Sequence, residues 1–190
     1  MKRAPYIKIV GGDFKGLKIF FKPSKLTRPT SNKSRETLFN WLMHDIKGST
    51  CLDMFAGTGA LGIEALSRGA SFVCFIEKNK KLCFEISKTL ERLRLQKKTI
   101  VINTNSLRML VNKGSKLNYD IIFLDPPYKE KLVEKALIKL QQSRMLNKDS
   151  LIYVETQKKD DSYKKLINVR NIKSKFKGQT CFNLIKIDDL

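Results

Sequence analysis

The central part of the chain alternates between short apolar runs and longer segments whose apolar residues recur at helical spacing. Short runs bounded by turn residues are typical of buried strands, and the longer spacing is typical of helices packed on a sheet. The alternation predicts strands near residues 51–53, 72–76, 99–103, 119–124 and 150–155, and helices at 61–68, 80–93, 107–112 and 130–142. Strands and helices that alternate in this way indicate an α/β fold with a mostly parallel sheet.

Both ends of the chain depart from this alternation. Residues 6–10 and 17–21 alternate in polarity and bracket a glycine-containing turn, which predicts a β-hairpin. Residues 168–174 and 180–187 form a second such pair, joined by a Lys-Gly turn, and predict an antiparallel end to the sheet. We therefore divide the chain into a small N-terminal β-hairpin extension and one main domain with a seven-stranded sheet, at residues 1–30 and 31–190.

A glycine-rich stretch follows the first strand of the main domain. Gly57, Gly59 and Gly62 satisfy the pattern G-x-G-x-x-G, and Glu77 ends the next strand. Glycine lets backbone N–H groups approach a ligand that a Cβ would keep away, and this pattern is typical of dinucleotide sites. Asp53 lies just ahead of the loop, where it would repel a pyrophosphate but suits the cationic ammonium and sulfonium of S-adenosylmethionine (SAM). A plain glycine-rich turn between strand and helix is the alternative without a ligand.

The loop and the ends of the next two strands form a candidate cofactor site. The Glu77 carboxylate can accept hydrogen bonds from two vicinal ribose hydroxyls, which suits SAM and NAD equally. Asn105 either offers its amide to an adenine ring or caps the following helix. An NAD-linked oxidoreductase therefore stays open at this point. The candidate cofactor-binding residues are Asp53, Phe55, Ala56, Gly57, Thr58, Gly59, Glu77, Asn105 and Ser106.

A candidate catalytic site directly follows the strand at residues 119–124 and consists of Asp125, Pro126, Pro127 and Tyr128. An exocyclic amine on a nucleobase is a poor nucleophile, because its lone pair is delocalised into the ring. The Asp125 carboxylate and the Pro126 carbonyl can both accept its N–H bonds, and the two prolines restrict the direction of that carbonyl. Tyr128 offers a flat face on which an extruded base can stack. The same four residues are also compatible with a simple turn.

The charge of the chain indicates a polyanionic partner. Lys and Arg number 38 against 18 Asp and Glu, which gives a formal net charge of +20 in 190 residues. Neutralising phosphates releases counterions and adds affinity, so we expect binding to nucleic acid, although compositional drift toward lysine would raise the charge as well. Pro and hydroxyl residues within 26–36 predict an exposed helix start. Cations at this position oppose the helix dipole, so their presence favours a phosphate bound there. The N-terminal hairpin either joins this surface or only covers an edge. The candidate RNA-binding residues are Arg28, Thr30, Lys33, Arg35 and Tyr128.

Other kinds of site find little support. Cys51, Cys74, Cys83 and Cys181 are scattered without the C-x-x-C spacing of metal sites, so we expect no metal cofactor. No stretch resembles a secretory signal or a transmembrane helix, and we therefore expect a cytoplasmic protein with reduced thiols. The single histidine, His44, is expected on the surface or at a helix cap.

Taken together, these motifs and the run Arg-Glu-Thr-Leu-Phe-Asn-Trp-Leu at residues 35–42 resemble the RsmD family over nearly the whole chain. That family comprises bacterial methyltransferases that modify the N2 amine of a guanine in 16S ribosomal RNA (rRNA). The resemblance implies a Rossmann-like class I SAM-dependent methyltransferase fold, SAM as cofactor, and the small ribosomal subunit or its assembly intermediate as partner. We expect a monomer that transfers the methyl group directly, without metal or covalent intermediate. A SAM-dependent methyltransferase of another RNA or DNA base, or a non-catalytic RNA-binding assembly factor, stays open.

Overall fold

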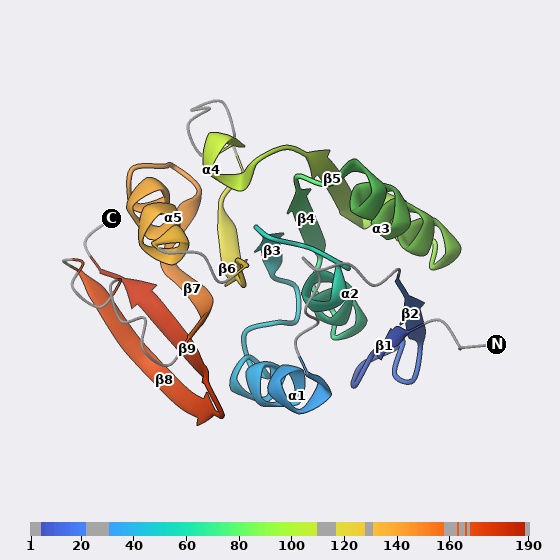
Figure 1. The fold of residues 1–190 in the computed structure, drawn as a ribbon, viewed down its shortest axis with the longest axis horizontal. Coiled ribbons are helices and arrows are strands. Elements are labelled where there is room, and N and C mark those ends of the chain that lie inside the picture. Colours follow the sequence, from blue (N-terminus) through green and yellow to red (C-terminus); the bar gives the residue numbers. More distant parts are fainter. Residues whose placement is uncertain are drawn as a thin grey trace.

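Strands and helices alternate along the middle of the chain in the computed structural model, as predicted (Figure 1). The structure describes residues 5–21, 31–109, 117–127, 131–157, 163, 166 and 168–188. In chain order the elements are β1 (Tyr6–Lys8), β2 (Lys18–Phe20), α1 (Asn32–Trp41), β3 (Thr50–Asp53), α2 (Ala60–Ser67), β4 (Phe72–Glu77), α3 (Lys80–Arg92), the 3-10 helix η1 (Gln96–Lys98), β5 (Thr99–Asn103), α4 (Ser106–Met109), β6 (Tyr119–Leu124), α5 (Leu132–Gln141), β7 (Leu146–Gln157), β8 (Val169–Lys177) and β9 (Thr180–Ile187).

A seven-stranded sheet in the order β5-β4-β3-β6-β7-β9-β8 forms the centre of the fold. The strands from β5 to β7 pair in parallel, whereas β9 runs antiparallel to β7 and β8 runs antiparallel to β9. This confirms the predicted mostly parallel sheet that ends in an antiparallel hairpin. Because β3 and β6 are neighbours, the glycine loop after β3 lies beside the segment that follows β6.

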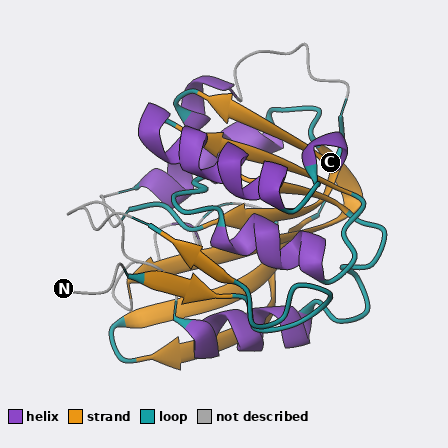
Figure 2. Cartoon of the chain, turned by 90° about the vertical axis from the view of Figure 1, so that its right-hand side faces the viewer, coloured by secondary structure: helices purple, strands orange, loops and turns teal. Residues whose placement is uncertain are grey.

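Consecutive residues of β6 pack on opposite faces of the sheet. Ile121 and Phe123 belong to the core beneath α1, α2 and α3, whereas Ile122 and Leu124 pack with α5. Side chains of a strand alternate in this way, and both faces of this strand are covered, so its sequence is apolar almost throughout. Figure 2 shows the strands lying between the helices.

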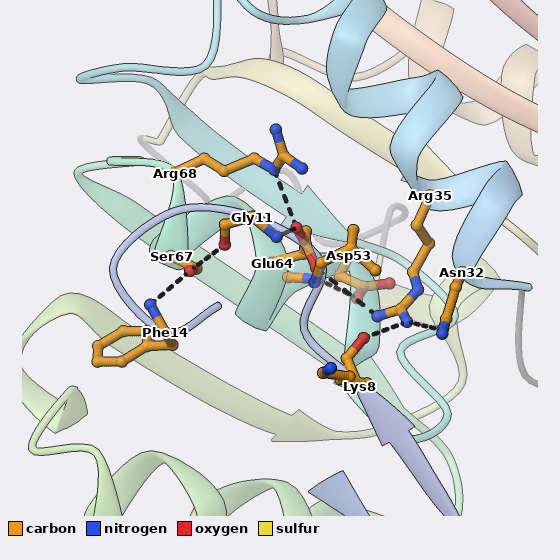
Figure 3. A network of polar contacts seen from close by, with 11 residues as sticks. Lys8, Gly11, Phe14, Asn32, Arg35, Asp53, Glu64, Ser67 and Arg68 are labelled. Carbon is orange, nitrogen blue, oxygen red and sulfur yellow. Dashed lines mark hydrogen bonds and ion pairs between the residues drawn. The ribbon is translucent and has the colours of Figure 1, made fainter. Parts of the chain in front are cut away.

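The N-terminal hairpin of β1 and β2 docks on α2 through a buried carboxylate (Figure 3). Glu64 accepts a hydrogen bond at Oε2 from the Val10 N–H at 2.9 Å and one at Oε1 from the Gly11 N–H at 2.8 Å. Ser67 Oγ accepts from the Phe14 N–H and donates to the Gly11 carbonyl. The predicted hairpin is therefore present and packs on a helix. Contact between this hairpin and RNA stays a prediction, and the proposed boundary at residue 30 lies outside the described residues.

The described residues were also expected to contain neither a membrane-spanning helix nor a metal site. Within them, no helix combines the length and apolar character needed to cross a membrane. In the same ranges, no group of three or more His, Cys, Asp and Glu side chains could hold a metal ion. All four cysteines are buried free thiols, and His44 is exposed just beyond α1, as predicted.

Candidate active site

A cavity of about 710 Å³ opens at the carboxyl ends of β3, β4 and β6. Side chains that follow parallel strands converge at one edge of the sheet, and this volume is typical of small-molecule sites. The structure brings the two candidate sites together in this single cavity. The predicted residues that line it are Asp53, Phe55, Ala56, Gly57, Thr58, Glu77, Asn105, Ser106, Asp125, Pro126 and Pro127.

Two glycines shape the turn after β3 and the packing of α2 on β4. Gly59 is the N-cap of α2 and has a φ of 77°, in the left-handed region that favours glycine. Gly62 faces the Phe75 ring of β4, and a Cβ at this position would overlap that ring. Gly57 and Thr58 form part of the cavity wall. Gly59 is not among the described residues that line it, and its contact with the cofactor stays a prediction.

Asp53 lies at the end of β3 and is only 2% exposed. Burial raises the pKa of its carboxyl to about 7; the hydrogen bond from the Gly62 N–H opposes this shift, and the charge of Glu77 adds to it. A carboxyl with such a pKa changes charge near neutrality, and a cation placed beside it would favour the ionised form. Asp53 can therefore act as a buried counter-ion for a positively charged ligand.

Glu77 ends β4 with its carboxylate held by two backbone groups. Oε2 accepts from the Gly57 N–H at 2.9 Å, and Oε1 accepts from the Asn79 N–H at 2.8 Å. A carboxylate oxygen has two acceptor positions, so each retains one for another donor. The geometry fixes a pair of oxygens at the cavity wall that suits two adjacent hydroxyl groups.

Asn105 and Ser106, which follow β5, both form hydrogen bonds with the backbone of nearby segments. Asn105 Oδ1 accepts from the Leu107 N–H at 3.0 Å, so the helix-capping interaction is formed at the start of α4. The residue also lines the cavity, and a contact between its amide N–H groups and adenine stays a prediction. Ser106 Oγ donates to the Met54 carbonyl and thereby links α4 to the end of β3.

Asp125, Pro126 and Pro127 follow β6 and line the cavity together. Pro126 is buried, while Asp125 and Pro127 are half-buried, so these residues combine a fixed backbone with access from the cavity. Tyr128 lies outside the described residues, and its stacking role stays a prediction. Arg28 and Thr30 lie outside them as well.

The sequence interpretation missed part of the cavity wall. Glu155, near the carboxyl end of β7, lines the cavity, as do Thr180 and Phe182 of β9 and Lys177 of β8. A signal for Glu155 existed, because it ends a predicted strand with a carboxylate, as Asp53 and Glu77 do. The residues of β8 and β9 gave no comparable signal, because their position depends on the order of strands in the sheet.

The prediction that Arg35 lies at an exposed helix start and binds phosphate is wrong. Its side chain is 0% exposed and faces the 0% exposed Glu64, with Nη1 and Oε2 3.7 Å apart. Nη2 donates to the Lys8 carbonyl at 2.6 Å and to Asn32 Oδ1 at 2.7 Å (Figure 3). Burial lowers the pKa of Arg35, and Glu64 opposes that shift. A charged side chain is seldom buried without a partner, and Glu64, the one charged residue of α2, is that partner.

Lys33 instead belongs to a surface that faces the solvent. Together with Lys175 and Lys177 it surrounds a hollow of about 210 Å³, which we call the lysine hollow. Lys175 Nζ donates to Thr37 Oγ1 at 3.2 Å, and Lys177 Nζ donates to Ser31 Oγ, at the N-cap of α1, at 2.7 Å. The described lining of the lysine hollow contains no acidic residue, so a phosphate group would meet only cations and neutral groups there.

Comparison with known proteins identifies the family. Residues 7–186 match the family model of conserved hypothetical protein 95. The chain is 46% identical to ribosomal RNA small subunit methyltransferase D of Buchnera aphidicola, over 80% of this chain and 79% of that protein. The protein of the same name from Haemophilus influenzae is 42% identical over the same shares of both chains. The chain belongs to the RsmD family. The resemblance inferred from the sequence motifs is thereby confirmed.

Solved structures agree with membership of the RsmD family. The Escherichia coli protein yhhF matches with a TM-score of 0.84 and 34% identity, over 97% of this chain and 99% of that one. A Haemophilus influenzae structure matches with a TM-score of 0.81 and 36% identity, over 97% and 100% of the two chains. The predicted class I methyltransferase fold is confirmed.

Proposed function

We propose that this RsmD-family protein transfers a methyl group from SAM to the exocyclic N2 amine of one guanine in the 16S rRNA of the small ribosomal subunit. The observation that supports this proposal is the single cavity that joins Asp53 and Glu77 to Asp125 and the two prolines after it. The assembled subunit or an assembly intermediate is the proposed partner, and this substrate places the reaction in the cytoplasm. The NAD-linked alternative is set aside, because both the family and its structural relatives are methyltransferases.

The half of the cavity at β3 and β4 fits SAM. Asp53 supplies a buried carboxyl for a cationic ammonium, and Glu77 offers two fixed oxygens to vicinal ribose hydroxyls. The loop at Gly57 and Thr58 presents backbone without bulky side chains at the cavity wall. When bound, SAM supplies an electrophilic methyl group.

The half of the cavity at β6 prepares the nucleophile. The Asp125 carboxylate accepts one N–H of the amine and the Pro126 carbonyl accepts the other, which favours the pyramidal, nucleophilic form of the nitrogen. Holding the amine in line with the methyl group lowers the activation barrier of methyl transfer. In the most favourable cases, such positioning of two reactants is worth about 7–11 kcal/mol. The methylated amine is a cation and a strong acid, and it releases its proton to water.

Substitution of either cofactor carboxylate should weaken SAM binding. Asp53→Asn removes the counter-ion, and Glu77→Gln replaces one hydroxyl acceptor by an amide N–H₂ group while retaining the shape. Each change removes a charge-assisted interaction, so we expect a loss of about 1.5–3 kcal/mol in binding free energy. Isothermal titration calorimetry with SAM measures it, and Glu91→Gln on the exposed surface of α3 is the matched control. Unchanged affinity in both variants would contradict the placement of SAM.

The raised pKa of Asp53, about 7, predicts a pH dependence with opposite signs for binding and stability. The ionised carboxylate binds the cation, so SAM affinity should rise by up to about tenfold per pH unit as the pH approaches 7 from below. Without SAM, the folded state keeps the proton up to about pH 7, whereas the unfolded chain releases it near 3.8, so this group makes stability fall as pH rises through that window. Thermal denaturation with and without SAM, across this pH range, checks both signs. Asp53→Asn should remove both dependences.

The lysine hollow should contribute to RNA affinity through phosphates. We expect the logarithm of RNA affinity to fall with the logarithm of salt concentration, with a slope of roughly −0.7 to −0.9 per bound phosphate. Replacing Lys33, Lys175 and Lys177 with Gln should flatten that slope by this amount for each phosphate that the variant no longer binds. Lys177 also lines the active-site cavity, but it does so from β8, at the opposite end of the sheet from β4 and β5, so SAM affinity should change little. The control is the same charge change at Lys80, Lys81 and Lys88 of α3, at the other end of the sheet (Figure 1). An equal effect of the two triple variants would show that total charge, and not the lysine hollow, determines affinity.

A further inference from the structure

The cavity contains a carboxylate beyond those assigned to SAM and to the amine. Glu155 lies two residues before the carboxyl end of β7, is 8% exposed, and lines the same cavity as Asp125. Strands β6 and β7 pair in parallel with Leu124 opposite Val154, and Asp125 and Glu155 are the next residues along these neighbouring strands. Successive side chains of a strand point to opposite faces, and the two carboxylate residues occupy equivalent positions. We therefore expect a ligand held by Asp125 to lie near Glu155 in this cavity.

A buried tyrosine orients this second carboxylate. The Tyr153 hydroxyl donates to Glu155 Oε2 at 3.1 Å. Tyr153 is 0% exposed, and its ring stacks on Phe182 of β9 with the centroids 6.4 Å apart and an interplanar angle of 10°. Burying a carboxylate is costly unless hydrogen bonds compensate for the lost water, so this arrangement holds a carboxylate at the cavity wall in a defined direction. An ionised carboxylate has about four acceptor positions, so Glu155 can bind Tyr153 and a ligand together.

Guanine is the base whose donors match two neighbouring carboxylates. Its N2 amine lies directly beside the N1–H donor, whereas the amines of adenine and cytosine lie beside a ring nitrogen that accepts. An ionised carboxylate is only an acceptor, so it attracts N1–H of guanine and repels the ring nitrogen of the other two bases. Enzymes that act on an extruded base read this Watson–Crick edge by hydrogen bonds.

We propose that Glu155 accepts the N1–H of the target guanine while Asp125 holds its N2 amine, so that the ends of β6 and β7 together form a guanine-specific subsite. The proposal rests on the proposed function, because it concerns the base that this function methylates. Thr180 and Phe182 form the wall of this subsite on the side of β9. Specificity for guanine is thereby built into the enzyme, in addition to any sequence recognition by the surrounding RNA contacts.

A base analogue separates this role from a merely structural one. 2-Aminopurine retains the N2 amine but has an acceptor at N1, and it can replace the target guanine in small subunits reconstituted with modified 16S rRNA. The wild-type protein should prefer guanine by about 10- to 100-fold in kcat/KM, because a site built for a donor rejects an analogue that lacks it. Glu155→Gln can donate to N1, so the preference should fall to within about threefold while SAM affinity is unchanged. Tyr153→Phe should lower the preference partially, and Glu91→Gln should not change it.

The fluorescence of 2-aminopurine gives a second readout that needs no turnover. Binding of the modified subunit should be tighter for Glu155→Gln than for the wild-type protein, in the same direction as the change in kcat/KM. If Glu155→Gln methylates guanine and keeps the wild-type preference, the guanine subsite is wrong and the proposed function stands. If the wild-type protein methylates no guanine at all, the proposed function fails and this inference fails with it.

Discussion

Replacing Asp125 with alanine should lower the rate of methyl transfer by about 10²–10³-fold and leave SAM affinity near the wild-type value. The reason is that Asp125 contacts only the reacting amine under the proposed mechanism, and it stabilises positive charge that develops on the nitrogen in the transition state. An interaction made mainly in the transition state affects kcat more than binding. Single-turnover measurements with saturating SAM and small subunits separate the chemical step from product release.

Asp125→Asn provides the sharper comparison. It keeps the shape and one acceptor oxygen but loses the negative charge, so we expect it to remain strongly impaired. Tyr128 is predicted to act by stacking, which is worth about 1–3 kcal/mol per base, so Tyr128→Phe should be nearly silent and Tyr128→Ala should weaken RNA binding. An Asp125→Asn variant with wild-type turnover would show that the charge has no part in the reaction. Equal impairment of Tyr128→Phe and Tyr128→Ala would assign the hydroxyl a chemical role.

Glu64→Gln should be the most destabilising of the changes considered, with a loss of about 3–5 kcal/mol in the free energy of unfolding. The Glu64 carboxylate is 0% exposed and faces the equally buried Arg35. It also accepts from Arg68 Nε at 2.9 Å and from the two hairpin N–H groups. Removing its charge leaves the Arg35 guanidinium buried without a counter-ion, and two of its nitrogens, Nε and Nη1, already have no hydrogen-bond partner within the described structure. Urea unfolding followed by circular dichroism measures the change.

A second substitution tests whether the uncompensated charge causes this loss. Arg35→Met removes the buried guanidinium that Glu64→Gln leaves without a counter-ion, so the double variant should be more stable than Glu64→Gln alone. The matched surface control is Asp188→Asn, which breaks the exposed pair with Arg170 and should leave the unfolding midpoint nearly unchanged. A double variant no more stable than Glu64→Gln would place the loss in the hairpin hydrogen bonds.

The features that local sequence determines could be predicted. Residues 119–124 form β6 with the predicted bounds, because a strand covered on both faces is a continuous apolar run. Asp53, Glu77 and Asp125 each end or follow such a run, and a parallel topology brings these strand ends to one edge of the sheet. Their common cavity therefore follows from the hydrophobic pattern together with one general rule of α/β folds.

The features that depend on contacts between distant segments could not be predicted from the sequence. The sequence around Arg35 predicts a cation on the surface of its helix. Its burial depends on Glu64 and on the docked hairpin, whose Gly11 is 53 residues away from Glu64 in the chain. Glu155 and Phe182 meet because β9 pairs with β7, which no local pattern specifies. A lone carboxylate in the apolar helix α2 was nevertheless a usable sign of a buried partner.

Transfer of an isotopically labelled methyl group from SAM tests the central claim most directly. Small subunits and naked 16S rRNA, both from cells that lack this enzyme, are incubated with the protein, and the RNA is digested to nucleosides and separated by mass. The account predicts one labelled N2-methylguanosine per subunit with the wild-type protein and almost none with Asp125→Ala. Label in a different nucleoside, or no label in either RNA from a folded protein that binds SAM, would contradict it.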